Sequence, residues 1–304
     1  MQHQNQDESG EKNTAVRLNK EIVLPTTVIN MNEDRRSHQL LRSSHKRQTV
    51  MNIGVSIGPY FDRIETVPDA FEYVEVGLGE GERPIGEVDV NSIIKRLDQQ
   101  NLDITVHLPY YQPLATAVET IDSATLSYLD SVLETASALG ATTAVAHPTR
   151  RGIAPDSDQF HDQLHDLVEI GRVHDITVCF ETTGYAGDLA LERVGETIDD
   201  VGGAICLDIG YAYLEAGVSG IRTLLTQHSD IVEHLHVHDG RHRGDTHIPV
   251  GSGDVAMADI GSLLQEFIPE ATATIEVFTD DTRHLTDSRQ RFVELTTDID
   301  SQYQ

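Results

Sequence analysis

The sequence predicts an α/β fold, a (β/α)8 barrel, and three observations support this. From residue 52 onward, short runs rich in β-branched residues alternate with amphipathic stretches, as in parallel β/α units. Eight such units can be counted, and the 254 residues after position 50 match the roughly 250 residues of such barrels. We therefore expect a single barrel domain over residues 51–304. Residues 1–50 are polar and are expected to form a disordered N-terminal extension, with Met51 as an alternative start.

The expected strands come first in each unit and the helices follow. The strands are predicted at residues 53–57, 73–77, 103–107, 142–147, 176–181, 204–208, 233–238 and 272–277. Apolar residues at spacings of three and four predict the helices between them. The clearest set is Leu126, Leu129, Val132, Leu133, Ala136 and Leu139, which Gly140 closes. The stretch between residues 57 and 73 has the weakest helical pattern.

An open, doubly wound sheet with a nucleotide site is the rival fold. Gly77, Gly79 and Gly81 follow the second strand, but their spacing is G-x-G-x-G and no clear helix comes after them. We therefore interpret this segment as a turn.

Composition indicates the setting of the protein. The first 50 residues hold 8 basic and 6 acidic residues, which leaves 14 basic and 44 acidic residues in the body, with Lys95 as its single lysine. Such a surface is typical of a halophilic protein, because strong salt screens its self-repulsion. The acidity disfavours a nucleic-acid partner, since phosphate contacts need clustered basic residues, although salt adaptation weakens that argument. The composition is compatible with a homo-oligomer.

Three further features of the sequence predict a cytoplasmic protein. No run approaches the roughly 20 apolar residues that span a bilayer, so we expect no membrane association. Arg35 and Arg36 are not followed by an apolar stretch of signal-peptide length. Cys179 and Cys206 each lie in an apolar run and are interpreted as core residues in a reducing compartment.

Acids and histidines recur where the expected strands end. They are His107, His147, Glu181, Asp208, His236 and Glu276, separated by 40, 34, 27, 28 and 40 residues. In a closed barrel these side chains meet at one mouth, where unpaired carboxylates repel one another and lose hydration. A divalent cation resolves that conflict. Glu181, Asp208, His236 and Glu276 make a mostly oxygen ligand set that suits Mn²⁺ or Mg²⁺, with Zn²⁺ or Co²⁺ as alternatives.

These residues lie in the segments VHLPYYQPLA, AHPTRRG, CFETTG, CLDIGYAYLEAG, HLHVHDG and GDTHIPVGSGD. Their order and placement resemble the xylose-isomerase-like TIM-barrel superfamily, over residues 52 to about 295. That superfamily holds sugar and sugar-phosphate isomerases and epimerases, and also zinc-dependent abasic-site nucleases of the endonuclease IV type. In its H-x-x-D motif the histidine is the metal ligand, which here is His236 ahead of Asp239. We interpret His234 as a buried structural histidine and His238 as a rim residue.

The resemblance implies a metal-dependent isomerase or epimerase that moves a proton next to a carbonyl through a metal-stabilised enediolate. Glu181 and Glu276 would be both ligands and the acid/base pair. The sugar hydroxyls would meet further residues, which are His107, His147, Tyr211, Arg241, Arg243 and His247. Alternatively, the two arginines are solvent-exposed charges of a loop. Gly251 and Gly253 either form a tight turn or let the backbone approach a substrate phosphate. Tyr110 and Tyr111 could stack on a ligand or simply pack.

The alternative function is an abasic-site nuclease with three zinc ions. His107 and His147 match its first site, and Asp245 with His247 matches the D-x-H of its third. That third site needs D-x-x-H after the sixth strand, where this chain has Tyr211, and neutral tyrosine is a poor zinc ligand. The departure favours the isomerase. A third alternative is an inactive barrel that only binds a ligand.

Overall fold

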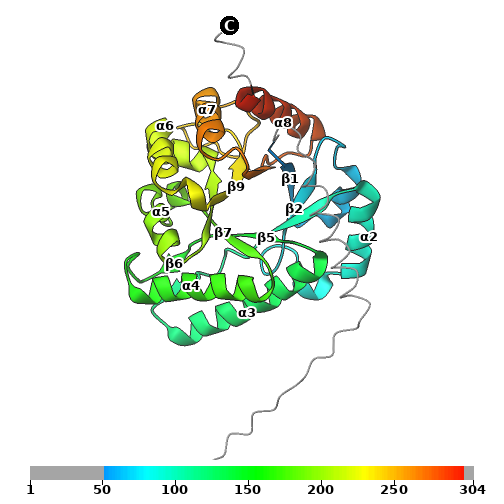
Figure 1. Ribbon diagram of the computed structural model, residues 1–304. Coiled ribbons are helices and arrows are strands. Elements are labelled where there is room, and N and C mark those ends of the chain that lie inside the picture. The colour runs from blue at the N-terminus through cyan, green and yellow to red at the C-terminus, as the bar shows by residue number, and fades with distance from the viewer. Residues whose placement is uncertain (1–50, 298–304) are drawn as a thin grey trace, which may run out of the picture.

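The computed structural model describes residues 51–297, and within them the barrel closes as predicted (Figure 1). Eight parallel strands follow one another in the order β1-β10-β9-β8-β7-β5-β3-β2. They are β1 (Ile53–Gly58), β2 (Tyr73–Gly77), β3 (Asp103–His107), β5 (Thr143–Ala146), β7 (Thr177–Glu181), β8 (Ala204–Asp208), β9 (Val232–Val237) and β10 (Thr272–Ile275). The expected disorder of residues 1–50 and the last residues of the predicted domain lie outside the described residues.

Helices ring the strands (Figure 1). They are α2 (Val90–Gln100), α3 (Glu119–Leu139), α4 (Asp158–Val173), α5 (Leu191–Asp200), α6 (Ile209–His228), α7 (Met257–Phe267) and α8 (Thr282–Thr297). Short 3-10 turns lie at η1 (Phe61–Thr66), η2 (Ile85–Glu87), η3 (Gly184–Ala186) and η4 (Ser229–Ile231), and β4 (Ala115–Thr116) pairs with β6 (Arg150–Arg151). The first unit has only η1 between its strands, in agreement with its weak helical pattern. No described helix is long and apolar enough to cross a membrane.

The helix boundaries follow from local sequence. Gly140 ends α3 in the left-handed conformation, with φ of 91°, and its N–H donates to the carbonyls of Ala136 and Ser137. Ser157 caps α4 by accepting the N–H of Phe160. The predicted apolar faces of α3 and α4 are largely buried against the barrel. The segment from Gly77 to Gly81 is a turn, closed by a bridge between Leu78 and Arg83.

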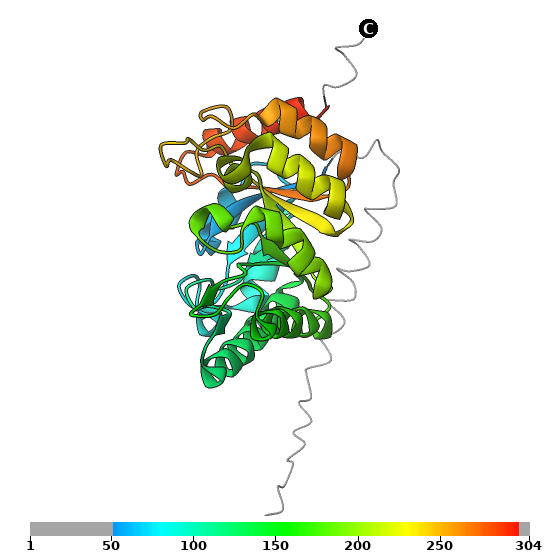
Figure 2. The same ribbon diagram turned by 90° about the vertical axis from the view of Figure 1, so that its left-hand side faces the viewer.

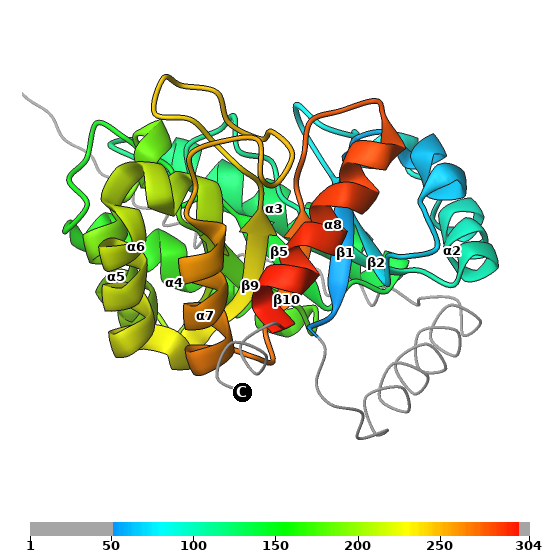
Figure 3. The same cartoon turned by 90° about the horizontal axis from the view of Figure 1, so that it is seen from above.

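The loops that follow the strands project from one end of the barrel (Figures 2 and 3). The long loop between β9 and α7 and the loop before α8 lie on this same side, where Figure 3 shows both at the top. In barrels of this type the C-terminal ends of the strands carry the active site. The fold thus brings the predicted strand-end residues to one mouth.

The inside of the barrel below that mouth is unusually polar. Glu75, Thr105, His234, His236 and Thr274 are all buried on the strands. Tyr73 donates to or accepts from Thr274 Oγ1 at 3.1 Å, deep between β2 and β10. Gly54 on β1 leaves the space that the Tyr73 ring occupies, because a Cβ at Gly54 would lie 2.2 Å from Cε2 of that ring.

We therefore expect Gly54→Ala to destabilise the barrel by about 1–3 kcal/mol through overpacking against Tyr73. Gly86→Ala is the matched control, because a Cβ there would meet nothing within 4 Å. Urea unfolding of both variants measures the free energy of unfolding. Equal stabilities for the two proteins would show that the Tyr73 ring can move aside.

Candidate metal centre and active site

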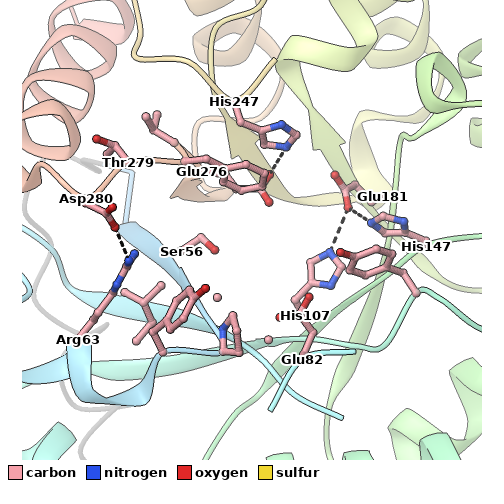
Figure 4. A pocket seen from close by; sticks show the side chains of 18 of the residues that line it. Ser56, Arg63, Glu82, His107, His147, Glu181, His247, Glu276, Thr279 and Asp280 are labelled. Atoms are coloured by element: carbon pink, nitrogen blue, oxygen red, sulfur yellow. Dashed lines mark hydrogen bonds and ion pairs between the residues drawn. The ribbon is translucent and has the colours of Figure 1, made fainter. Parts of the chain in front are cut away.

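The mouth of the barrel contains a cavity of about 540 Å³ (Figure 4). Its inner wall carries His107, His147, Glu181, His247 and Glu276. Its outer wall carries Ser56 of β1 and residues that follow β1 and β10, which are Tyr60, Arg63, Phe278, Thr279 and Asp280. The cavity is therefore acidic and rich in imidazole at its base, and holds an ion pair between Arg63 and Asp280 (2.7 Å) toward its rim.

Four residues predicted as metal ligands meet at the base of this cavity. Glu181, Asp208, His236 and Glu276 each offer one ligand atom, and these atoms lie within 4.8 Å of one another. They come from β7, β8, β9 and the residue directly after β10, and the register places Asp208 opposite His236. All four side chains are buried. Three carboxylates in so small a buried volume need a positive charge among them.

His236 is oriented as a ligand would be. Its Nε2 lies 3.1 and 3.3 Å from the two oxygens of Glu75. Its Nδ1 lies 3.2 Å from Glu181 Oε1 and 3.2 Å from Glu276 Oε2, yet makes no hydrogen bond to any described residue. A buried nitrogen without a hydrogen bond, facing carboxylates, fits a divalent cation. The donor set of three carboxylates and one imidazole suits a hard ion.

The electrostatics of this cluster follow from burial and mutual contact. Burial alone would raise the pKa of Glu181, but the imidazoles of His236, His147 and His107 lower it well below its ordinary range. Burial likewise opposes the lowered pKa of Glu276, which depends on His236 and His247. Both carboxylates are therefore ionised, as metal binding requires. Burial raises the pKa of the neighbouring Cys206 thiol, so this buried cysteine remains a protonated core residue.

A second cluster shares Glu181. His147 Nε2 lies 2.8 Å and His107 Nε2 lies 3.3 Å from Glu181 Oε2. The ligand atoms of these three residues also lie within 4.8 Å of one another. Figure 4 shows both imidazoles pointing at this one carboxylate. Tyr110 stacks on His147 at 4.9 Å between ring centroids, so it packs against the cluster, while Tyr111 stacks on Tyr110 and is largely exposed.

His238 is not the rim residue that the sequence suggested. It is fully buried, its Nε2 lies 3.0 Å from Asp208 Oδ2, and its Nδ1 lies 3.0 Å from the backbone carbonyl oxygen of Asp239. Gly210, at the start of α6, packs against its ring, because a Cβ there would lie 2.1 Å from His238 Cε1. His234 is the buried, hydrogen-bonded histidine that was predicted. Tyr211 lines the cavity, with its ring 5.4 Å from both His238 and His247.

Asp239 organises the loop over the site. Its carboxylate accepts the backbone N–H groups of Gly240, Gly251, Gly253 and Val255. The Gly251 and Gly253 N–H groups are thus already used, which favours the tight-turn interpretation over the phosphate one. A Cβ at Gly253 would lie 2.2 Å from Asp239 Oδ1, so only glycine fits this approach.

The arginines predicted to meet substrate lie elsewhere. Arg241 and Arg243 both pair with Asp245 Oδ2 at 2.8 Å, and neither lines the cavity. Arg63, in η1, is the one basic side chain other than histidine among the cavity-lining residues within the described range. Asp245 is turned to its two arginines, whereas His247 Nε2 faces Glu276 Oε2 at 3.4 Å. The D-x-H pair therefore does not act as one ligand set in this structure.

Two residues of the site were missed in the sequence. Glu75 lies in YVEVG, where an acid interrupts an apolar strand, and that interruption was a usable signal of a buried functional group. Arg63 lies in the weakly patterned first unit, and no local feature indicates that it reaches the cavity. Its place depends on Asp280, 217 residues away.

The protein is a (β/α)8 barrel in which carboxylates and imidazoles cluster at the C-terminal ends of the strands. The chain belongs to the xylose isomerase-like TIM barrel family, which matches residues 66–295. An uncharacterized protein of Methanocaldococcus jannaschii is 26% identical over 221 residues, or 67% of this chain and 84% of that protein.

Solved structures share the fold. A D-tagatose 3-epimerase-like protein has a TM-score of 0.66 at 20% identity, over 81% of this chain and 98% of its own. A D-allulose 3-epimerase from Methylomonas sp., in complex with D-allulose, has a TM-score of 0.65 at 15% identity, over 81% and 97% of the two chains.

The metal-free protein should lose stability as the pH rises from about 6.5 to 9. Burial alone would lower the pKa of His107 and of His238, but Glu181 and Asp208 respectively raise both to about 9. Below the unfolded pKa near 6.5 this stabilisation is complete, and it is lost as pH rises through the folded value, at about 1.4 kcal/mol for each pKa unit. Urea unfolding in chelator at pH 6, 7.5 and 9 measures it; a flat profile would contradict it.

Proposed function

We propose that this protein is a metal-dependent isomerase or epimerase of sugars or sugar phosphates, which moves a proton at the carbon next to a carbonyl. The observation that carries the proposal is the bare Nδ1 of His236 among three buried carboxylates. The likeness to 3-epimerases of ketoses supports the substrate class, and the match to the xylose isomerase-like family supports the reaction type.

Glu181, Asp208, His236 and Glu276 would hold the ion, and their oxygen-rich set favours Mn²⁺ or Mg²⁺ over Zn²⁺ or Co²⁺. When bound, the ion polarises the substrate carbonyl and balances the negative charge that develops on its oxygens. Glu181 and Glu276 line the cavity and are ionised, so either can take a proton from the substrate. The glutamate that has taken the proton can return it, and the other glutamate can return one on the opposite face after it has taken a proton from solvent. Their two carboxylates thus combine the roles of ligand and acid/base group.

The remaining groups of the cavity would orient the substrate. His107, His147 and His247 present imidazole nitrogens, and Tyr211 presents a neutral phenol, because burial raises its pKa. These groups donate and accept hydrogen bonds in the way that sugar hydroxyls require. Arg241 and Arg243 are left out of the proposal, since Asp245 holds both outside the cavity. Arg63 takes the place of the expected basic residue.

The proposal predicts that Glu276→Gln lowers turnover by about 10²-fold or more, because the amide cannot transfer the proton. Exchange of the proton at the reacting carbon into D₂O, followed by NMR on a panel of ketoses and ketose phosphates, measures turnover at saturating Mn²⁺. Glu266→Gln is the control, since this exposed glutamate of α7 does not line the cavity. Activity retained in Glu276→Gln protein of verified metal content would refute the assigned role.

A second candidate function is phosphodiester hydrolysis at an abasic site. The cluster of His107, His147 and Glu181 favours it, because the shared Glu181 could bridge two ions. Tyr211 and the Arg-paired Asp245 argue against the third zinc site that this function needs.

The number of ions per chain separates the two functions. Metal analysis of the purified protein should find one ion if the isomerase proposal is right. Two or three ions, together with cleavage of an abasic duplex in strong salt with added Zn²⁺, would establish the nuclease instead.

A further inference from the structure

We propose that Glu75 is the positioning residue of the metal centre: it holds the ring proton of His236 on Nε2 and so leaves Nδ1 free to bind the ion. This inference rests on the metal site of the proposed function. It also assigns a role to His234 and to the polar interior of the barrel, which that function leaves unexplained.

Glu75 lies on β2, across the barrel from the strand that carries His236, and its side chain is 1% exposed. Its Oε2 is 3.3 Å and its Oε1 3.1 Å from His236 Nε2. Among the described residues, Glu75 is the hydrogen-bonding oxygen partner of this nitrogen. An ionised carboxylate only accepts hydrogen bonds, so a contact with His236 Nε2 is favourable only when that nitrogen carries the proton.

Glu75 is itself fixed in this orientation. His234 Nε2 lies 3.3 Å from its Oε2 and Thr274 Oγ1 donates to the same oxygen at 3.3 Å. His234 is held in turn, because its Nδ1 contacts Thr272 Oγ1 at 2.6 Å. Thr274 also contacts the phenol of Tyr73. A buried carboxylate that turned away from these donors would lose every hydrogen bond, at considerable cost.

The consequence falls on the other nitrogen of His236. A neutral imidazole carries one ring proton, so a proton on Nε2 leaves a lone pair on Nδ1. That lone pair faces Glu181 and Glu276, each 3.2 Å away. A hydrogen bond from a ligand histidine to a carboxylate fixes its tautomer and ring orientation and raises its basicity. The Glu75–His236 contact has the geometry of such a pair.

The motif HLHVHDG now has one use for each of its histidines. Alternate residues of a strand point to the same face, so His234, His236 and His238 form a column inside the barrel. His234 donates to Glu75, His236 lies between Glu75 and the ligand carboxylates, and His238 contacts Asp208. His234, the first histidine of the column, thus helps to orient His236 through Glu75.

The first test measures Mn²⁺ affinity of the whole chain by titration calorimetry. Glu75→Gln keeps the size of the side chain and removes its charge, and we expect about 10- to 100-fold weaker binding. Glu233→Gln is the matched control, because it makes the same change at an exposed position of β9, the strand that carries His236; its affinity should stay within a few-fold of the unaltered protein. Unfolding in chelator shows whether both variants remain folded.

The second test reads the proton directly. In protein loaded with Zn²⁺, two-bond proton–nitrogen NMR of the histidines should show His236 protonated on Nε2 and ligated through Nδ1, with the signal assigned by its loss in His236→Gln. Glu75→Gln should shift the Nε2 proton resonance, whereas Glu233→Gln should leave it in place. A proton on Nδ1 of His236 would overturn the proposal.

The outcomes separate the two proposals. Glu181→Gln serves as the reference variant that removes a ligand and must weaken binding. If the unaltered chain binds no divalent ion, both the proposed function and this inference fail. If it binds Mn²⁺ and Glu75→Gln binds equally well while Glu181→Gln does not, only the role of Glu75 is refuted.

Discussion

The structure of this protein depends on one electrostatic constraint: three carboxylates are buried around a single imidazole at the mouth of the barrel. Glu181, Asp208 and Glu276 lose most of their hydration there, and their mutual repulsion is strong in so dry a place. The imidazole of His236 is one means of balancing that charge, and the proposed cation is the other. The surrounding histidines supply further positive or polarised groups within hydrogen-bonding distance.

Much of the nearby architecture can be understood as support for this cluster. Each residue of the proposed metal site has its own partner: Glu75 for His236, His238 for Asp208, His247 for Glu276, and the pair His107 and His147 for Glu181. Asp239 supports the backbone in a similar way, because its carboxylate accepts N–H groups of the loop that carries His247. The polar barrel interior thus forms a continuous set of contacts that orients the mouth.

The predominantly acidic cavity sets a condition on its ligand. Apart from histidine, Arg63 is the one basic side chain among the described lining residues, and Asp280 already pairs with it. The positive charge at the base must therefore come from histidines or from an ion. A neutral polyhydroxyl molecule can satisfy such a wall through hydrogen bonds, whereas a polyanion such as nucleic acid would meet the acidic groups unshielded. This physical argument agrees with the composition of the chain.

The sequence by itself determined the barrel and the identity of the clustered residues, because strand periodicity and strand-end position are local properties. His107, His147, Glu181, Asp208, His236 and Glu276 could all be read from it. Only the tertiary structure decided that Glu75 faces His236, that His238 is buried and that Arg63 rather than Arg241 reaches the cavity. The physical reason is that these contacts join strands and loops far apart in the chain, where closure of the barrel, and no local pattern, sets the distance.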